Sequence, residues 1–428
     1  MKTYVVFPKN LGPPVSQFEV ANRERSLQRA DRVRAVLMQA GIIAPRILTN
    51  SGLIGPTGEI EASPLRGAEQ VRFKQVPRVL EALDVALIDD PDPDQLARLR
   101  NLAVVVENVE VPLVEPVATN GVPASQAVIP WHLQTINVAA ARAQGLTGQG
   151  VRIGIIDTGI DASHSEFAGK SISFAEYDAS GYLISTTPRD AGDHGTHVSA
   201  LAAGAAYGVA PQAELAVAAV LTTKTPRGMV GYLAQILAGF NWIAHSNHST
   251  TGISQCPVIN ASLGGVGYDP WLDSSVVTIR SVPAALLIAA IGNSGRHGVN
   301  NHGSPGNYRD VLGVGATDPN DVVTNFSDWG IESTYAALKP DLSAPGLDIE
   351  SARPGGGTQY MSGTSMASPQ VAGAAALLVQ KYPALRRNPQ GLYNLLLRLV
   401  DAAPTTNPLN HASGYSRLGA GRLDLTHI

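Results

Sequence analysis

The stretch Val151-Arg152-Ile153-Gly154-Ile155-Ile156-Asp157 decides the fold that the sequence predicts. It is a short apolar run, mostly Val and Ile, that ends in a carboxylate. Runs of this kind, bounded by Gly, Asp, Asn or Pro, are typical of parallel strands buried on both faces. Further runs follow along the chain: AELAVAAVL (213–221), CPVINASLG (256–264), ALLIAAIG (285–292) and DVLGVGAT (310–317).

Helical stretches separate these runs. They are rich in Ala, Leu and other apolar residues, as helices that cover a sheet are. They read HVSALAAGAAY (197–207), YLAQILAGFNWIAH (232–245) and PQVAGAAALLVQKY (369–382). The alternation of strands and helices predicts an α/β fold over residues 131–428, a three-layer sandwich with a mostly parallel central sheet.

A different pattern precedes this unit. Residues 1–115 alternate short strand and helix signals, which predicts a small α+β module, with TYVVFP (3–8) as an edge strand. Residues 116–130 carry Pro116, Pro123 and Pro130 around the polar turn Thr119-Asn120-Gly121. We interpret this segment as an exposed linker.

Composition excludes several classes of protein. The chain has 428 residues, 44% of them apolar, and a net charge of -4 without a block of Lys or Arg, so neither nucleic acid nor a membrane is an implied partner. The single cysteine, Cys256, excludes an intrachain disulfide and a cysteine-built zinc site. The apolar runs, including the one at 282–291, are too short to span a membrane.

Polar residues gather where the predicted strands end. Asp157, Ser262 and Asn293 each close a strand, while His194 and Ser365 each open a helix. In a parallel sheet, ligands and reactive groups collect at the carboxyl ends of the strands. We therefore expect these five side chains to converge on one edge of the sheet.

Three of these residues match the needs of acyl transfer by serine. The reaction needs a nucleophile, a base that takes its proton, and an acid that orients the base. Ser365 in GTSMASP lies at a glycine-hinged helix start, where backbone N–H groups are free to bind an oxyanion. His194 in DHGTHV suits the base, and Asp157 in IIDTGID suits the acid.

Five motifs, in this order, resemble the subtilisin family of serine proteases over residues 127–428: IIDTGID, DHGTHV, NASLGG, AAIGNSG and GTSMASP. The resemblance implies a subtilisin-like fold with a triad of Asp157, His194 and Ser365. It also implies that Asn293 supplies the side-chain donor of the oxyanion hole, beside the backbone N–H of Ser365. It makes His197 a buried, hydrogen-bonded histidine, and we read Asp161 and Asp193 as turn-capping carboxylates.

The resemblance also suggests where substrate binds. Ser262, Leu263 and Gly264 would form an edge that pairs with an extended peptide, and Gly231 to Leu233 the opposite rim. The S1 slot, which takes the P1 residue before the scissile bond, would be lined near Gly264, Ala290 to Gly292 and Gly303. None of these positions is charged, so we expect a broad specificity that leans to apolar P1 residues.

Metal and phosphate sites are not predicted. The chain HGTHVSALAAGAAYGVAP (194–211) has no room for the loop that forms the tightest calcium site of many relatives, so no cofactor is required, although weaker calcium sites stay open. Glu166 is interpreted as a solvated surface carboxylate, and His245 and His248 as part of a polar loop. Gly148 and Gly150 precede a strand, whereas a phosphate loop follows one.

By position, residues 1–115 resemble the propeptide of the same family, which would act as an intramolecular inhibitor. The hypothesis is a self-processed zymogen of a serine endopeptidase, cleaved between Glu115 and Gln126. Two alternatives stay open: a transpeptidase or macrocyclase, with lid candidates at 222–231 and 246–255, and a catalytically silent peptide-binding scaffold. The lack of an export signal favours the cytoplasm, while an inhibitory propeptide favours secretion.

Overall fold

The computed structural model describes residues 2–9, 32–42, 77–118, 129–245, 256–281, 284–412 and 415–428. The strands of its main sheet are β6 (Arg152–Asp157), β7 (Ile172–Tyr177), β8 (Leu183–Ser185), β9 (Glu214–Ala219), β12 (Val258–Ala261), β14 (Leu286–Ala290), β16 (Leu312–Thr317), β19 (Leu342–Pro345), β22 (Val400–Asp401) and β25 (Arg422–Leu423). The five apolar runs in the sequence became β6, β9, β12, β14 and β16. The sequence analysis did not identify β19, whose four residues LSAP give little periodic signal.

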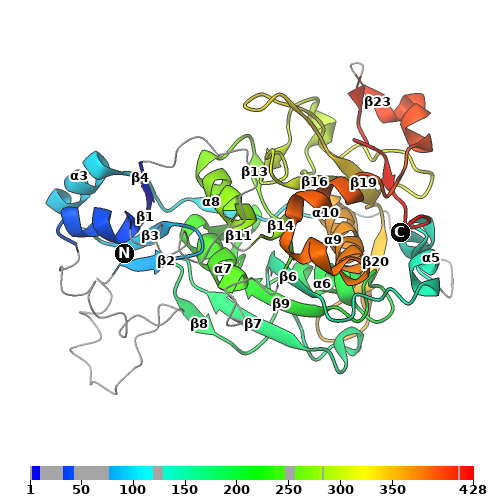
Figure 1. Ribbon diagram of the computed structural model, residues 1–428, viewed down its shortest axis with the longest axis horizontal. Coiled ribbons are helices and arrows are strands. Elements are labelled where there is room, and N and C mark those ends of the chain that lie inside the picture. Colours follow the sequence, from blue (N-terminus) through cyan, green and yellow to red (C-terminus); the bar gives the residue numbers. More distant parts are fainter. Residues whose placement is uncertain are drawn as a thin grey trace.

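Within the described residues the main sheet has ten strands in the order β22-β25-β19-β16-β14-β12-β6-β9-β7-β8 (Figure 1). Neighbours from β25 to β7 run parallel. The edge strands β22 and β8 run antiparallel to their neighbours. The predicted, mostly parallel sheet is confirmed.

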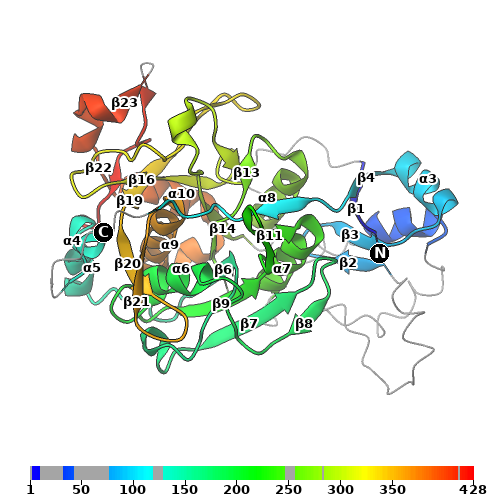
Figure 2. The same cartoon turned by 180° about the vertical axis from the view of Figure 1, so that it is seen from behind.

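Helices cover both faces of this sheet (Figures 1 and 2). On one face, α6 (His194–Ala203) and α9 (Thr364–Lys381) pack on Ile153 and Ile155 of β6. On the other, α7 (Leu233–His245) and α8 (Pro270–Ser281) share a core with Ile156. Successive side chains of a strand point to opposite faces, so one apolar strand serves two cores and the three layers follow.

Smaller elements surround these layers. No described helix is long and apolar enough to cross a membrane. The remaining α-helices of this unit are α4 (Trp131–Thr135), α5 (Val138–Ala143) and α10 (Pro389–Leu396). Its other strands and 3-10 helices are β10 (Thr223–Thr225), β11 (Gly228–Tyr232), β13 (Gly265–Val266), β15 (Gly303–Ser304), β17 (Gly330–Glu332), β18 (Ala337–Lys339), β20 (Ile349–Ala352), β21 (Thr358–Met361), β23 (His411–Ala412), β24 (Tyr415–Ser416), η2 (Ser165–Phe167), η3 (Gly295–His297), η4 (Pro383–Arg387), η5 (Ala403–Thr406) and η6 (Pro408–Asn410).

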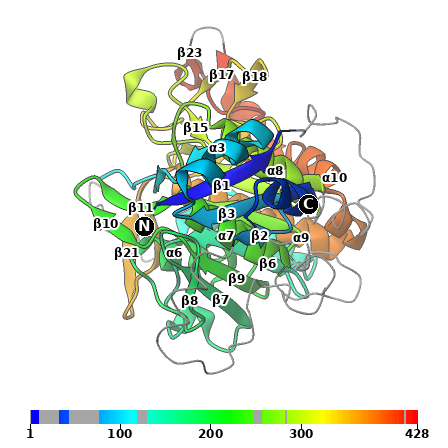
Figure 3. The ribbon, with the colours of Figure 1, turned by 90° about the vertical axis from the view of Figure 1, so that its left-hand side faces the viewer.

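The N-terminal module is an antiparallel sheet with helical cover (Figure 3). Its order is β2-β3-β1-β4, formed by β1 (Thr3–Pro8), β2 (Arg78–Leu80), β3 (Val85–Asp89) and β4 (Ala103–Glu107). The prediction that residues 3–8 form an edge strand was wrong, because β1 pairs with β3 on one side and β4 on the other. All six of its residues are buried, which is typical of a central strand. Helix α3 (Pro93–Leu102) begins at a capping box made by Asp92 and Gln95.

The module's sheet packs against the helical layer of the larger unit. Val5, Phe7 and Leu87 belong to the same buried cluster as α7 and α8, and the ring of Phe7 lies 5.9 Å from that of Trp271. The opposite face of the module's sheet forms a separate small core around Val6 and the helical residues 32–39. The module is therefore docked on the larger unit, and the chain leaves it through β5 (Glu110–Pro112).

Candidate active site

Asp157 and His194 meet at the carboxyl edge of the sheet. Asp157 is the last residue of β6 and His194 the first of α6, and the His194 Nδ1 to Asp157 Oδ1 distance is 2.8 Å. Both side chains are buried, at 0% and 2% exposure. The same Asp157 oxygen accepts the N–H of Thr158 at 2.7 Å. A carboxylate held in this way selects the imidazole tautomer with its proton on Nδ1, which leaves Nε2 as an acceptor.

Asp190, which the sequence analysis missed, organises the loop before α6. Its carboxylate accepts from Thr158 Oγ1 at 2.6 Å and from the N–H groups of Gly192 and Thr196. Asp193 was expected to cap this helix, but its side chain makes no capping hydrogen bond. Asp193 has a left-handed backbone, and Asp190 satisfies the helix N–H instead. No local signal separates the two acids, because the capping contact depends on the path of the loop.

Asp161 behaves as expected. Its carboxylate accepts the N–H of Ser163 at 3.0 Å and that of Gly355 at 2.8 Å, so it stabilises a turn.

Gly195 allows a close approach of two backbone segments, since a Cβ there would lie 2.1 Å from the Gly159 carbonyl oxygen. That missing Cβ lets the first turn of α6 approach the end of β6.

The two histidines of DHGTHV have opposite electrostatics. Burial lowers the pKa of His194, but the charge and hydrogen bond of Asp157 outweigh it, with help from Asp190 and Glu115, so the pKa is raised. Burial lowers the pKa of His197 to about 3, and the nearby His194 adds to the shift. The Nε2 atom of His197 lies 3.1 Å from the Ile349 carbonyl oxygen. His197 is therefore a neutral, buried histidine, which confirms the prediction.

Ser365 lies in the first turn of α9 and is fully buried. Its Oγ donates to the carbonyl oxygen of Val114 at 2.9 Å. His194 Nε2 has no hydrogen-bond partner among the described residues. The Ser365 hydroxyl is thus turned toward the chain's own backbone, and α9 packs on the same face of the sheet as α6, the helix that begins at His194.

That backbone belongs to residues 109–117, which cross the cleft as an extended strand. On one side β5 pairs with β11, where Val111 lies opposite Gly231, and the N–H of Leu233 donates to Val109. On the other side, Leu113 forms an antiparallel bridge with Leu263. The N–H of Gly264 donates to Pro112 at 2.9 Å, and that of Val114 to Ser262 at 3.4 Å. The rims named in the sequence analysis thus face each other across the chain's own segment.

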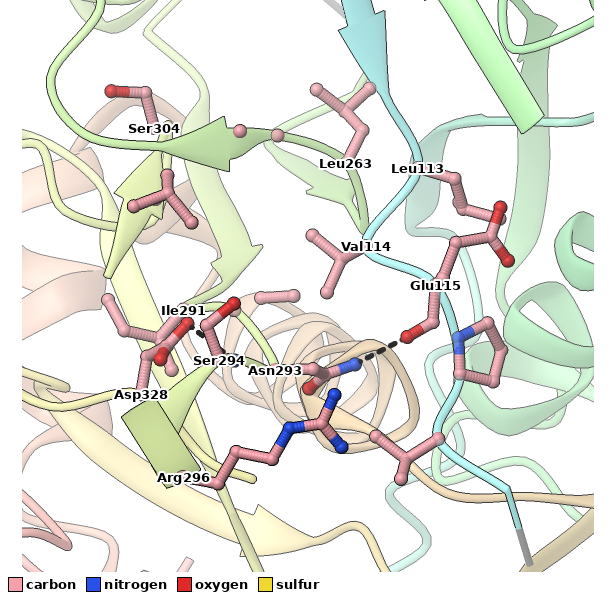
Figure 4. A pocket seen from close by; sticks show the side chains of 18 of the residues that line it. Leu113, Val114, Glu115, Leu263, Ile291, Asn293, Ser294, Arg296, Ser304 and Asp328 are labelled. Atoms are coloured by element: carbon pink, nitrogen blue, oxygen red, sulfur yellow. Dashed lines mark hydrogen bonds between the residues drawn. The ribbon is translucent and has the colours of Figure 1, made fainter. Parts of the chain in front are cut away.

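Asn293 follows β14 and faces the same segment (Figure 4). Its Nδ2 donates to the carbonyl oxygen of Glu115 at 2.9 Å. Its Oδ1 accepts the N–H of Thr364 at 2.9 Å, which fixes the orientation of the amide. The side-chain donor therefore points at the carbonyl that follows the one bound by Ser365.

A cavity of about 430 Å³ lies beside Val114, whose side chain points into it (Figure 4). Gly264, Ala290, Gly292 and Gly303, all expected near the S1 slot, contribute to its wall, as does Leu263 of the predicted substrate-pairing edge. The expected lining was incomplete, because three charged residues also line the cavity: Asp328, Arg296 and, from the chain's own segment, Glu115. Asp328 is far from these residues in the sequence and reaches the slot only through the fold.

Glu166 is not the solvated surface carboxylate expected from the sequence. It is 8% exposed, and its Oε2 accepts the N–H groups of Ala206 at 2.9 Å and Tyr207 at 3.2 Å. The carboxylate thus satisfies the backbone of the short loop after α6. No group of three or more His, Cys, Asp or Glu residues suited to a metal ion occurs in the described part of the chain.

Some expectations fall on other parts of the chain. Residues 246–255, which include His248 and one lid candidate, lie outside the described residues, as does the side chain of His245. The other lid candidate, 222–231, contains the hairpin of β10 and β11. Gly148 and Gly150 precede β6, as expected for a turn that does not bind phosphate.

A family model described as "Subtilase family" matches residues 148–415. Among curated proteins, Subtilisin-like protease 5 of Arthroderma benhamiae is 35% identical over 280 residues, which cover 64% of this chain and 65% of that protein. The Thermostable alkaline protease of Halalkalibacterium halodurans is 33% identical over 284 residues, covering 65% of this chain and 70% of that protein. The chain thus spans about two thirds of the length of these relatives.

Among solved structures, the prenylagaramide maturation protease PagA matches with a TM-score of 0.53 and 26% identity. The match covers 67% of this chain and 95% of that one.

Proposed function

Because the chain belongs to the subtilase family of serine proteases, we propose that it is a serine endopeptidase made as a self-inhibited precursor. The observation that carries the proposal is the chain's own segment across the cleft, with the Val114 carbonyl oxygen 2.9 Å from Ser365 Oγ. An extended peptide held between two rims, beside an Asp–His pair and a serine hydroxyl, is what peptide hydrolysis requires.

In the proposed mechanism Ser365 is the nucleophile. Its Oγ attacks the carbonyl carbon of the P1 residue while His194 Nε2 takes the Oγ proton. The C–N bond then breaks, the amine leaves with that proton, and the acyl group stays on Oγ as an ester. Water, deprotonated by His194, hydrolyses the ester. Asp157 holds the ring and stabilises the imidazolium, and Asn293 Nδ2 with the N–H of Ser365 would bind the oxyanion.

The register of residues 109–117 in the cleft supports cleavage of the Val114–Glu115 bond. This bond lies one position before the region predicted from the sequence, Glu115 to Gln126. Val114 and Pro112 bind the rim through Ser262 and Gly264, as a P1 and a P3 residue would. The described arrangement is not reactive, because Asn293 binds the carbonyl of Glu115 instead of that of Val114. We infer that the precursor rests in an inhibited state. Reaction requires the Val114 carbonyl to move to Asn293 and Ser365 Oγ to turn to His194.

Val114 also supports an S1 slot that accepts apolar side chains. It is the only P1 candidate that the register offers, and its Ser262, Leu263 and Gly264 neighbours are uncharged.

A fluorophosphonate probe tests the proposed nucleophile. We expect it to label the wild-type chain on Ser365, identified by mass spectrometry of the peptide that contains SGTSMASP. In Asn293→Ala, loss of the side-chain donor is expected to slow labelling and to lower kcat for a peptide substrate by about 10²–10³-fold, the range measured for the matching residue of a related protease. As a matched control, Ser163→Ala removes an exposed serine that does not line the cavity and should leave both rates unchanged. Labelling at another serine, or no labelling after removal of residues 1–114, would exclude the mechanism.

A transpeptidase or macrocyclase is the second candidate. The observation that keeps it open is the likeness to PagA, a maturation protease. The β10–β11 hairpin lies along residues 110–113, before the scissile bond, so it does not cover the side from which an amine would replace water. Product mass separates the two, since hydrolysis adds one water and ligation adds none. A silent peptide-binding scaffold would not react with the probe at all.

We also propose that the loop after α6 needs no calcium ion. Glu166 supports this, because its carboxylate already accepts two backbone N–H groups of the loop. In a Ser365→Ala background, which prevents autolysis, Glu166→Ala should lower the free energy of unfolding by about 1–3 kcal/mol, since two buried donors lose their acceptor. Glu166→Gln keeps an acceptor and should lower it less. Urea titration measures both changes. If a chelator strongly lowered the free energy of unfolding of the Ser365→Ala chain in which Glu166 is unchanged, this proposal would be contradicted.

A further inference from the structure

The cavity beside Val114 extends beyond what a valine side chain fills. Its volume is about 430 Å³, within the range of small-molecule pockets, and small residues such as Gly264, Ala290 and Gly292 form part of its wall. The short side chain of Val114, an isopropyl group, points from the strand into this space (Figure 4). A longer P1 side chain would therefore reach further into the cavity than Val114 does.

Asp328 lines this cavity and is 1% exposed. One of its oxygens, Oδ2, accepts the N–H of Ser294 at 3.1 Å, as drawn in Figure 4. The other, Oδ1, is buried and has no hydrogen-bond partner among the described residues. A buried carboxyl oxygen without a donor costs free energy, so such a group marks a place where a ligand can supply the missing bond.

The backbone is shaped to bring this carboxyl group to the slot. The N–H of Asp328 donates to the Gly292 carbonyl at 3.1 Å. Gly292 has φ +119°, and a Cβ there would lie 2.1 Å from Asp328 Oδ2. Any other residue at 292 would separate the S1 wall from the carboxyl group.

We propose that Asp328 gives the S1 slot a second specificity, for P1 side chains that end in a cation, Lys or Arg. The inference rests on the proposed function, since it concerns the P1 residue of the peptides that Ser365 attacks. Short apolar P1 side chains such as that of Val114 occupy the part of the slot next to the bound strand. A Lys or Arg side chain reaches the unpartnered oxygen and donates to it, which forms a charge-assisted hydrogen bond shielded from water.

The second specificity depends on pH. Burial raises the pKa of Asp328 to about 7, against a small lowering by the Ser294 N–H. The charged residues that line the slot with Asp328 are Glu115 of the cleft segment and Arg296 of η3, and Arg417 binds the neighbouring Ser327 carbonyl. Asp328 is therefore neutral below about pH 7 and anionic above it. A bound cation favours the anion, so with Lys or Arg at P1 the change occurs at a lower pH than in the free enzyme.

The experiment uses the self-processed protein and fluorogenic peptides Val-Pro-Leu-X, which copy residues 111–113, with X as Leu, Met, Lys or Arg. Active enzyme is counted by the fluorophosphonate probe. The quantity measured is the ratio of kcat/KM for Lys to that for Met, a neutral side chain of similar length, from pH 5.5 to 8.5. We expect this ratio to rise about tenfold or more in the wild type, and to stay flat in Asp328→Asn. Asp193→Asn, which removes a carboxylate beside His194 but outside the slot, should keep the rise.

A flat ratio in the wild type, or a rise that persists in Asp328→Asn, would overturn the role of Asp328. The wild-type profile decides the matter even if Asp328→Asn does not fold. A chain that neither reacts with the probe nor cleaves the Leu and Met peptides would instead overturn the proposed function. The two failures are therefore distinguishable.

Discussion

Ser365→Ala is expected to leave the 428-residue chain uncleaved and to lower kcat for peptide hydrolysis by about 10⁶-fold, the scale seen when the nucleophile of a related serine protease is removed. The reason is that the nucleophilic side chain that contacts the Val114 carbonyl, among the residues the structure describes, is the Ser365 hydroxyl. Without Oγ no acyl-enzyme forms, although the segment still pairs with both rims. Intact mass spectrometry of the purified protein and the rate with a fluorogenic peptide measure the two effects.

The variant also separates self-cleavage from cleavage by another protease. In the wild type we expect a new C-terminus at Val114 and a new N-terminus at Glu115. Ser163→Ala serves as the processing control, since that serine does not line the cavity. If Ser365→Ala were cut at the same bond when made without other proteases, self-processing would be refuted. Cleavage between 115 and 126 in the wild type would instead refute the register of the segment.

Asp157→Asn is expected to lower kcat by about 10⁴-fold, the fall seen when the same change is made in the triad of a serine protease, with little effect on KM. His194 Nδ1 lies 2.8 Å from Asp157 Oδ1, so the carboxylate accepts the Nδ1 proton and leaves Nε2 ready to act as base. An amide at this position can donate to Nδ1 and thereby select the wrong tautomer. Steady-state kinetics on the processed protein measure kcat and KM, and a loss that fell mainly on KM would contradict this role.

The same variant changes the pH profile. His194 acts as a base only when neutral, so activity falls as the pH drops through its pKa. Asp157 is the main cause that raises that pKa against burial. In Asp157→Asn the negative charge is lost, so the acid limb of kcat/KM should move to lower pH while the plateau falls. Asp161→Asn is the matched control, because it changes a turn-capping carboxylate four residues on and should leave the limb in place.

The sequence alone determined the layers of this protein and the residues at the edge of its sheet. Five apolar runs bounded by Gly, Asp, Asn or Pro predicted five strands of a parallel sheet, because a strand that is buried on both faces must be apolar along its whole length. Asp157, Ser262 and Asn293 were predicted to converge because parallel strands present their carboxyl ends together. The local pattern failed at the N-terminus, where the position of β1 within its sheet depends on which strands pair with it.

Only the tertiary structure decided what surrounds these residues. Asp328 reaches the S1 cavity, Glu166 the loop after α6, and Asp190 the start of that helix through contacts between segments that no local periodicity records. The register of residues 109–117 in the cleft is likewise set by backbone hydrogen bonds to β11 and to Ser262–Gly264. Such bonds use the backbone C=O and N–H groups that nearly all residues share, so the sequence does not encode them locally. The type of reaction could be predicted from the side chains in the motifs. The peptide bond that lies next to Ser365, and the residues at the bottom of the S1 slot, follow from how the backbone packs.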